Sequence, residues 1–305
     1  MVSIITKKIK GKEYLYLVHS IKKKDKVIKK NIKYIGKKRP IPKEEFECMV
    51  YSYNNEDWIL NDYKNYLSYQ DHNKMKKASH NYKLYLSNLD KVSKEKEREK
   101  FLSVFISNSN SIEGSTMSVK DTFNYLFKDI VPENINKKEI FMADNLFKAW
   151  LYLESNYKRL PTKKDLLKLH TLVNKNIEEE FTLGKYKLFQ NYIGDTITTS
   201  YLFVDEKMKK LFDWIKEAYK EVDDFEIAFQ SHAQFEIIHP FIDGNCRVGR
   251  LLLNWLLMYK GLSPLAIFEK ERNIYINALE NSRKGKAEAI VKFCFKTYIN
   301  QYQFV

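Results

Sequence analysis

Helix-breaking residues are scarce in this chain. Its 305 residues include only nine glycines and six prolines, and the long stretches between them are rich in Leu, Lys, Glu, Phe and Tyr. Because Gly and Pro interrupt helices most strongly, this texture favours helices and argues against a loop-rich β protein. Apolar residues make up 44% of the chain, enough for a buried core. We therefore predict a mainly α protein with one large domain or two smaller ones.

Apolar residues recur at three- and four-residue spacing in several segments. This spacing predicts helices over residues 73–107, 121–127, 138–157, 162–174, 206–222, 225–238 and 251–259. Residues 181–204 differ, because they are rich in β-branched and aromatic residues and contain two glycines. For them we predict a β-hairpin or extended flap.

The start of the chain is basic and rich in β-formers. Residues 1–39 hold fourteen Lys and Arg against two acidic residues, in a chain whose net charge is +14. Two runs, 13–21 and 27–35, predict the strands of a small hairpin or meander before a helical region at 43–305. Lysines within residues 7–39 could bind nucleic-acid phosphates. A solvated face that keeps the protein soluble is the alternative.

Other sequence features favour a soluble protein in a reducing compartment. The first residues lack the hydrophobic stretch of a secretion signal, and no apolar run approaches the length of a membrane span. Cys48, Cys246 and Cys294 form neither a CxxC pair nor a disulfide pattern. We therefore expect a cytoplasmic protein that does not contact a membrane.

Residues 239–250, HPFIDGNCRVGR, combine a helix end, a turn and a helix start. Pro240 disfavours helical geometry at His239 and so holds this histidine at the end of one helix. Asp243, Gly244 and Asn245 are turn residues. The next helix would begin at about Cys246, and the free N–H groups at a helix start bind anions.

The side chains of this segment suit phosphate chemistry. Arg247 and Arg250 are three residues apart, so they share a helix face and can both bind phosphate oxygens. Asp243 among these cations suits a Mg²⁺ ion that also contacts substrate phosphates. His239 is placed as a general base, since an unperturbed histidine has a pKa near 6.5. Together they indicate phosphoryl or nucleotidyl transfer to a hydroxyl.

The same segment resembles the signature of the Fic family, H-P-F-x-[D/E]-G-N-G-R-x-x-R. The resemblance implies a protein adenylyltransferase that moves AMP from ATP to a Ser, Thr or Tyr hydroxyl of a target protein, with pyrophosphate as the leaving group. It implies that His239 is the base, that Asp243 binds Mg²⁺, and that a phosphate site is formed by Gly244, Asn245, Cys246, Arg247 and Arg250.

The family fold that this resemblance implies is a helical bundle with a β-hairpin flap, which aligns the target segment by strand addition. Residues 184–194 match that flap, with Lys187, Tyr192 and Gly194 as target-docking residues. The resemblance also implies self-association into a homo-oligomer and self-modification.

Cys246 departs from the family signature, which has glycine at this position. If the position needs a positive φ, a side chain there costs roughly 1–2 kcal/mol. If it is an ordinary first helical residue, cysteine is tolerated. A thiol at a helix N-terminus can also have a lowered pKa, which would permit redox tuning.

A second motif, residues 109–114 with the sequence SNSIEG, resembles the family's inhibitory helix motif, [S/T]-x-x-x-E-[G/N]. It would end an inhibitory helix at about 101–114, with Ser109 and Glu113 as inhibitory residues. Glu113 would pair with Arg250 in the place of the γ-phosphate. In some family members the equivalent glutamate helps to remove AMP. A helix cap at Gly114 is the alternative explanation.

Several alternatives stay open. The site could transfer another phosphate-containing group, or the chain could be a nucleic-acid-binding regulator with a degenerate Fic domain. We expect His170 and His232 to be core residues. Tyr275 and Asn277 could border an adenine pocket or simply lie on a helix packed against the motif.

Overall fold

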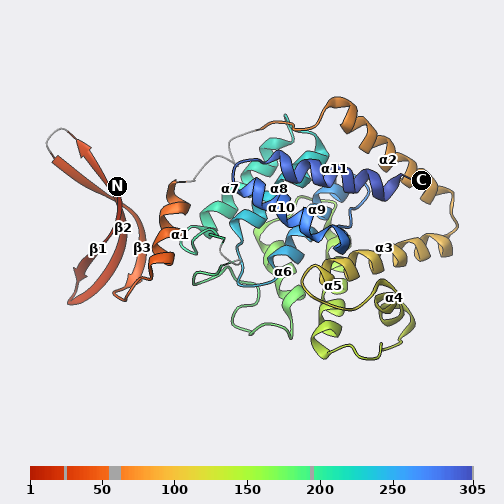
Figure 1. Cartoon of the computed structure of the whole chain (residues 1–305), viewed down its shortest axis with the longest axis horizontal. Helices are drawn as coiled ribbons and strands as arrows, with labels where there is room; N and C mark the ends of the chain where they lie inside the picture. Colours follow the sequence, from red (N-terminus) through yellow and green to blue (C-terminus); the bar gives the residue numbers. More distant parts are fainter. Residues whose placement is uncertain (24–25, 55–62, 193–195, 304–305) are drawn as a thin grey trace.

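The structure, a computed structural model, describes residues 1–23, 26–54, 63–192 and 196–303. Figure 1 shows a small sheet at one end of a larger helical body. The described strands are β1 (Val2–Ile9), β2 (Lys12–Lys23) and β3 (Lys26–Lys37). The described helices are α1 (Lys43–Asn54), α2 (Tyr69–Asn88), α3 (Lys91–Ser111), α4 (Val119–Lys128), α5 (Lys137–Asn156), α6 (Lys163–Asn174), α7 (Val204–Ala218), α8 (Asp224–Ile238), α9 (Asn245–Tyr259), α10 (Arg272–Arg283) and α11 (Glu288–Tyr302). The mainly α prediction is confirmed.

The N-terminal strands form an antiparallel sheet in the order β1-β2-β3. The two predicted strands correspond to β2 and β3, and β1 adds a third strand that pairs Val2 with His19. Leu15, Leu17 and Ile35 on one face of the sheet are buried against Met49 of α1 and against Phe203. Helix α1 therefore shares a core with the sheet, although it lies beyond the predicted boundary at residue 42.

Polar contacts join this sheet to α7, and α1 to the segment before α7. Ser200 donates its backbone N–H to Ser52 Oγ of α1 at 2.7 Å. Lys33 of β3 forms an ion pair with Glu206 at 2.6 Å. Arg39 forms a further ion pair with Glu45 of α1 at 2.5 Å. Helix α1 is thus bonded directly to the segment that was predicted to form the flap, and the sheet is bonded to the start of α7.

The helical body is built around two central helices. All of α8 after its first residue is buried, and α9 is buried over most of its length. Burial on most sides explains the apolar character of α9. Helix α8 also buries polar side chains, among them Glu226, His232 and Glu236. The predicted helices 121–127, 138–157, 162–174 and 225–238 correspond to α4, α5, α6 and α8.

The prediction of one helix over residues 73–107 was wrong. The segment divides into α2 and α3 at Leu89 and Asp90. Asp90 accepts hydrogen bonds from the backbone N–H groups of Val92 and Ser93 at 2.8 and 3.0 Å, so it caps a new helix. Apolar periodicity continues across this break and conceals it.

The predicted β-hairpin does not form in the described part of residues 181–204. The described part of this segment consists of turns, bends and backbone without regular secondary structure, with one bridge residue, Thr196. Side-chain hydrogen bonds take the place of a strand ladder: Lys187 Nζ donates to Thr198 Oγ1 at 3.0 Å, and Thr198 Oγ1 donates to the backbone oxygen of Asn191 at 2.8 Å. We call residues 181–203 the flap.

Among the described residues, none of the helices combines the length and the apolar character needed to cross a membrane.

Candidate active site

His239 is fixed at the C-terminal end of α8. It adopts a left-handed conformation with φ 51° and ψ 63°, and its backbone N–H donates to the oxygen of Phe235 at 2.9 Å. A left-handed non-glycine residue costs of the order of 1–2 kcal/mol, which the surrounding structure has to offset. The predicted role of Pro240 is consistent with this geometry, because the helix stops where the proline follows.

The imidazole of His239 is buried, with 8% of the residue exposed. Two side-chain amides contact its Nδ1: Asn191 Nδ2 at 3.3 Å and Asn245 Nδ2 at 3.2 Å. Burial, together with the charges of Lys187 and Arg283, lowers the pKa of His239 well below 6.5. The ring is therefore neutral at physiological pH, as a general base requires.

Gly244 caps the start of α9 with φ 73°. An added Cβ would lie 2.4 Å from Nδ2 of Asn174. Glycine is therefore required for both backbone conformation and space. Asn245 holds the preceding loop, because its Oδ1 accepts from the N–H of Phe241 at 2.8 Å and its Nδ2 donates to the oxygen of Phe241 at 2.9 Å.

Cys246 is an ordinary residue in the first turn of α9, and it is absent from the described non-glycine residues with positive φ. The change from the family's glycine therefore carries no backbone strain. Burial and the nearby carboxyl groups of Glu236 and Glu113 raise the pKa of Cys246 well above 9. The lowered thiol pKa that a helix N-terminus can produce is therefore not found at Cys246, because burial and the two carboxyl groups outweigh the helix N-terminus.

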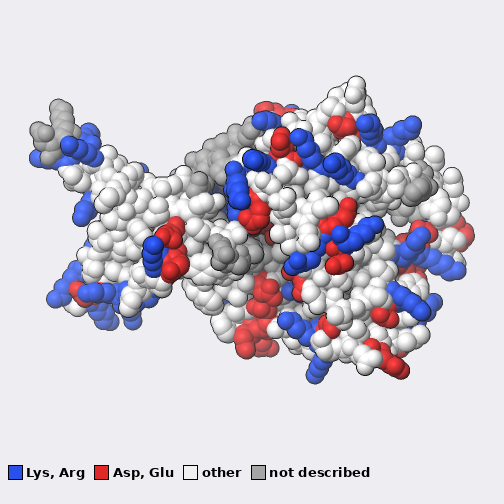
Figure 2. Space-filling view, viewed as in Figure 1, with Lys and Arg blue, Asp and Glu red and all other residues white. Residues whose placement is uncertain are grey.

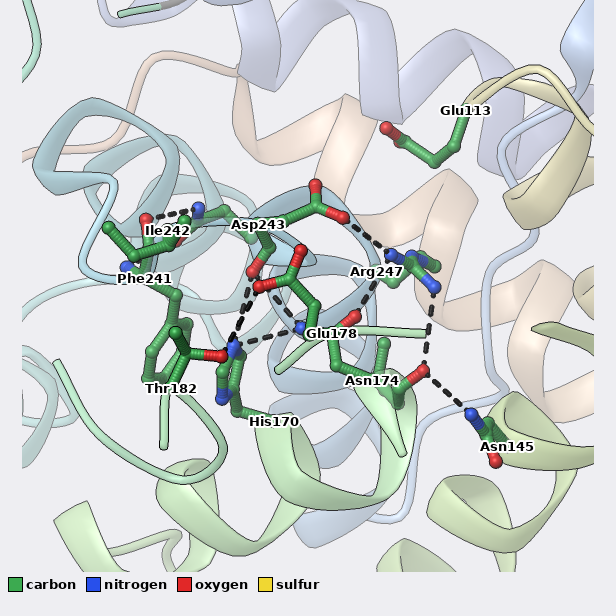
Figure 3. Close-up of polar contacts among 12 residues, drawn as sticks. Glu113, Asn145, His170, Asn174, Glu178, Thr182, Phe241, Ile242, Asp243 and Arg247 are labelled. Atoms are coloured by element: carbon green, nitrogen blue, oxygen red, sulfur yellow. Dashed lines mark hydrogen bonds and ion pairs between the residues drawn. The ribbon is translucent and has the colours of Figure 1, made fainter. Parts of the chain in front are cut away.

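Asp243 and Arg247 face each other across the first turn of α9 (Figure 3). The Asp243 carboxylate is 52% exposed and lies 3.4 Å from Nη2 of Arg247. Arg247 is buried and also donates to Asn174 Oδ1 at 3.1 Å. The pKa of Glu178 is raised by burial and then by the charge of Asp243, so a second carboxyl group lies near this edge of the site.

Arg250 meets the C-terminal end of α3. Its Nε donates to Ser109 Oγ at 2.7 Å, and its Nη2 donates to the backbone oxygen of Ser109 at 2.8 Å and to Glu113 Oε1 at 2.9 Å. Burial opposes the positive charge, but Glu113 raises the pKa of Arg250 above its ordinary value. The predicted ion pair between Glu113 and Arg250 is present, and Ser109 contributes to the same contact.

Two guanidinium nitrogens of the site have no hydrogen-bond partner among the residues that the structure describes. Arg247 Nε and Arg250 Nη1 are both buried and unpaired. A buried donor without a partner is costly, by about 1–3 kcal/mol. Phosphate oxygens would satisfy both donors. Figure 3 shows Arg247 beside Asp243, with Glu113 on the same side of the site, so the guanidinium donors suit phosphate oxygens while the Glu113 carboxylate opposes them.

A magnesium ion also fits these residues. Asp243 supplies a half-exposed carboxylate beside the space for phosphates. Within the described part of the chain, no group of three or more His, Cys, Asp or Glu side chains gathers as a metal site. One carboxylate with substrate phosphates is a usual arrangement for Mg²⁺, which keeps several waters.

The two described target-docking residues that we predicted differ in their exposure to solvent. Tyr192 is 47% exposed on the flap. Lys187 is 3% exposed, and its Nζ donates to Asn191 Oδ1 at 2.7 Å, so its ammonium group is not available to a docking peptide. Gly194 lies outside the described residues. Burial lowers the pKa of Lys187 to about 7.

Three side chains that the sequence did not single out for the site hold its loop in place. Asn191 donates to the backbone oxygens of Phe241 and Ile242 at 2.9 and 3.1 Å. Asn174 donates to the oxygen of Asp243 at 3.2 Å. His170, predicted as a core residue, is buried but also contacts Asp243 O through Nε2 at 3.2 Å. The i, i+4 spacing of His170 and Asn174 on an apolar helix face was the available signal.

Tyr275 and Asn277 do not face a common pocket. Tyr275 is buried, and its hydroxyl lies 2.7 Å from Nε2 of His232, which is also buried as predicted. Asn277 is exposed and contacts Asn281. The idea that both border an adenine pocket is therefore wrong, because they lie on different sides of α10.

Comparison with known sequences identifies a family and several proteins that this chain resembles. Residues 160–257, which include the whole 239–250 motif, match the Fic/DOC family. The chain is 28% identical over 191 residues to "Protein adenylyltransferase Fic" of Drosophila willistoni, covering 62% of this chain and 38% of that protein. It is 27% identical over 201 residues to "Protein adenylyltransferase fic-1" of Caenorhabditis elegans, covering 63% and 39%. The matched part is thus less than half of each relative.

Solved structures show the same fold. Fic-1 of C. elegans has a TM-score of 0.67 at 24% identity, and the match covers 77% of this chain and 71% of that chain. A Fic domain containing signaling protein of Bacteroides thetaiotaomicron has a TM-score of 0.67 at 21% identity, covering 75% and 95%.

Proposed function

We propose that this chain, which contains a Fic domain, is a protein adenylyltransferase that transfers AMP from ATP to a hydroxyl of a protein. The observation that carries the proposal is the convergence of a neutral histidine, an exposed carboxylate and two buried arginines at the start of α9. The names of the relatives support the same activity.

The proton transfer falls to His239. Its neutral ring, buried beside the flap, takes the proton of the target hydroxyl. The resulting oxygen nucleophile attacks the α-phosphorus of ATP, the bond to the β-phosphate oxygen breaks, and pyrophosphate leaves. The unpaired nitrogens of Arg247 and Arg250 would bind the negative phosphate oxygens during this transfer.

Asp243 would hold Mg²⁺ against the phosphates. When bound, the ion supplies positive charge that neutralises phosphate oxygens and orients them. The remaining orientation comes from the protein, because Asn245 and Asn174 fix the loop on which Asp243 lies. Positioning of this kind accounts for most of the catalysis in phosphoryl transfer.

Glu113 would act as a brake. Its carboxylate occupies one side of the Arg250 guanidinium and would repel the γ-phosphate. ATP that binds nonetheless would present its α-phosphate poorly to the hydroxyl. Since Glu113 lies just after the end of α3, the ion pair between Glu113 and Arg250 could be broken by a movement of that turn alone. Because the equivalent glutamate helps to remove AMP in some proteins of the family that the motif resembles, we include the reverse reaction in the proposal, with Glu113 assisting water.

Label transfer tests the activity. We expect the chain to become labelled by self-modification when incubated with Mg²⁺ and ATP that carries a radioactive α-phosphate. ATP labelled at the γ-phosphate should leave no label, because that phosphate departs in pyrophosphate. Omission of Mg²⁺ is the control. Label retained from the γ-position would instead indicate phosphate transfer, and label from neither position in a Glu113→Gly variant would contradict the proposal.

The pH dependence follows from the lowered pKa of His239. The active form is the neutral ring, and it is lost only as the pH falls through this lowered pKa. An unshifted histidine would be about three-quarters protonated at pH 6 and would lose roughly four-fold in rate. We expect the labelling rate at pH 6 to stay within about two-fold of that at pH 7.5. A four-fold fall over this interval would show that the ring is not shielded as described.

A further inference from the structure

The sheet has one covered face and one open face. Residues that pair directly across strands point to the same side. Pairing sets Lys7 opposite Tyr14 and places both Ile5 and Tyr34 opposite Tyr16. The other side carries the residues buried against α1 and Phe203. We call the side with Ile5, Lys7, Tyr14, Tyr16, Asn31, Tyr34 and Lys37 the open face, and Figure 1 shows α1 on the opposite side of the sheet.

Three tyrosines form a cluster at the centre of the open face. The ring centroid of Tyr34 lies 6.0 Å from that of Tyr14 and 5.3 Å from that of Tyr16. Tyr34 is 52% exposed, although burial of an aromatic ring is normally favourable. Lys7 lies over the ring of Tyr16, 4.8 Å from its centroid, and is held there by a 3.0 Å hydrogen bond to Asn31 Oδ1.

The charge around this cluster has one sign. Figure 2 shows Lys and Arg side chains gathered at both ends of the sheet. Glu13 is the acidic residue among the described residues of the three strands, and Lys38 pairs with it at 2.9 Å. Of the remaining lysines of the strands, Lys33 pairs with Glu206 of α7, and the described residues of the strands hold no second carboxylate for the others. The remainder of the chain is nearly neutral.

We propose that the open face binds single-stranded nucleic acid, a function separate from AMP transfer. Lysines would contact the phosphates, and Tyr34 would stack on an unpaired base. The rings favour a single strand, because the bases of a duplex are already stacked and paired. An acidic protein would use the lysines but leave the central rings without a partner. RNA and DNA single strands share the groups that this surface recognises.

Fluorescence anisotropy with labelled oligouridine and oligothymidine of about twenty nucleotides tests the proposal on the full chain. We expect binding that weakens as salt rises from roughly 50 to 200 mM. Tyr34→Ala should weaken it by about ten-fold, whereas Tyr34→Phe, which keeps the ring, should bind like the unaltered chain. A Lys7→Glu, Lys37→Glu double variant should bind more weakly and show a shallower salt dependence.

Matched controls come from α2. Tyr69 is 77% exposed and Lys77 is exposed, and both lie outside the sheet. Tyr69→Ala and Lys77→Glu should leave binding unchanged. Equal affinity of the Tyr34→Ala and Tyr34→Phe variants would overturn the proposal. Equal or tighter binding of a duplex of the same length, of polyglutamate or of anionic lipid vesicles would also overturn it. Because ATP and Mg²⁺ are absent from this assay, its outcome is independent of the transferase activity.

Discussion

A Glu113→Gly variant is expected to transfer AMP about ten- to hundred-fold faster than the unaltered chain, because displacement of reacting groups by about 1 Å can cost that much. The substitution removes the carboxylate that lies 2.9 Å from Arg250 Nη2. Arg250 is then free to bind a phosphate oxygen with both of its terminal nitrogens. Incorporation of label from α-labelled ATP at several ATP concentrations measures the change.

The substitution should leave the fold intact. Glu113 lies in the turn that follows α3 rather than within the helix, so glycine causes little loss of helix stability there. Ser111→Gly at the end of the same helix is the matched control and should not raise the rate. Glu113→Gln, which keeps the shape but removes the charge, should give an intermediate rate. Equal rates for unaltered and Glu113→Gly protein at every ATP concentration would exclude a brake at this position.

His239→Asn, made in the Glu113→Gly protein, is expected to lower the labelling rate by a factor of roughly 10²–10⁴, the usual contribution of a general base. Asparagine is chosen because it tolerates the left-handed conformation that His239 adopts. ATP binding, measured by calorimetry, should change by no more than a few-fold, since the proposed phosphate contacts are made by Arg247 and Arg250 and not by His239.

The exposed histidine of α2, His80, provides the control, and His80→Asn should keep full activity. Thermal unfolding of each variant separates a loss of chemistry from a loss of folding. Retention of more than about a tenth of the rate in a folded His239→Asn protein would mean that another group accepts the proton.

The 239–250 motif was predictable because its determinants are local. Pro240 ends α8, and Gly244 starts α9 in a conformation that favours glycine. The contact between Glu113 and Arg250 spans 137 positions in the sequence, and it was predicted only from the resemblance of two motifs to one family. The local sequence pattern identified the groups that we propose to carry the chemistry, and the family resemblance identified Glu113 as the partner of Arg250.

The supports of the site were not predictable, because they depend on tertiary contacts. Asn191 and Asn174 are 50 and 69 positions from the backbone oxygens that they hold. No feature of its sequence neighbourhood distinguishes Asn191 from a surface asparagine, and the only signal for Asn174 is its i, i+4 spacing from His170 on an apolar helix face. The β-hairpin prediction for the flap was wrong for a similar reason. The β-branched and aromatic residues of the flap suggested a pair of strands, but Lys187 and Thr198 are buried and hold the loop through a hydrogen bond between them. The break at Asp90 was hidden within an unbroken apolar period.

The small core beneath the sheet has a practical consequence for protein engineering. Met49 and Phe203 are both fully covered, and the side chains that cover them include Leu15 and Leu17 from the sheet. A shortened protein that starts at residue 43 would expose both to water and promote aggregation. Catalytic measurements on such a fragment would therefore also reflect the disturbed packing of Phe203 at the end of the flap. Single substitutions on the intact chain are a cleaner way to distinguish the contribution of the sheet from that of the candidate active site.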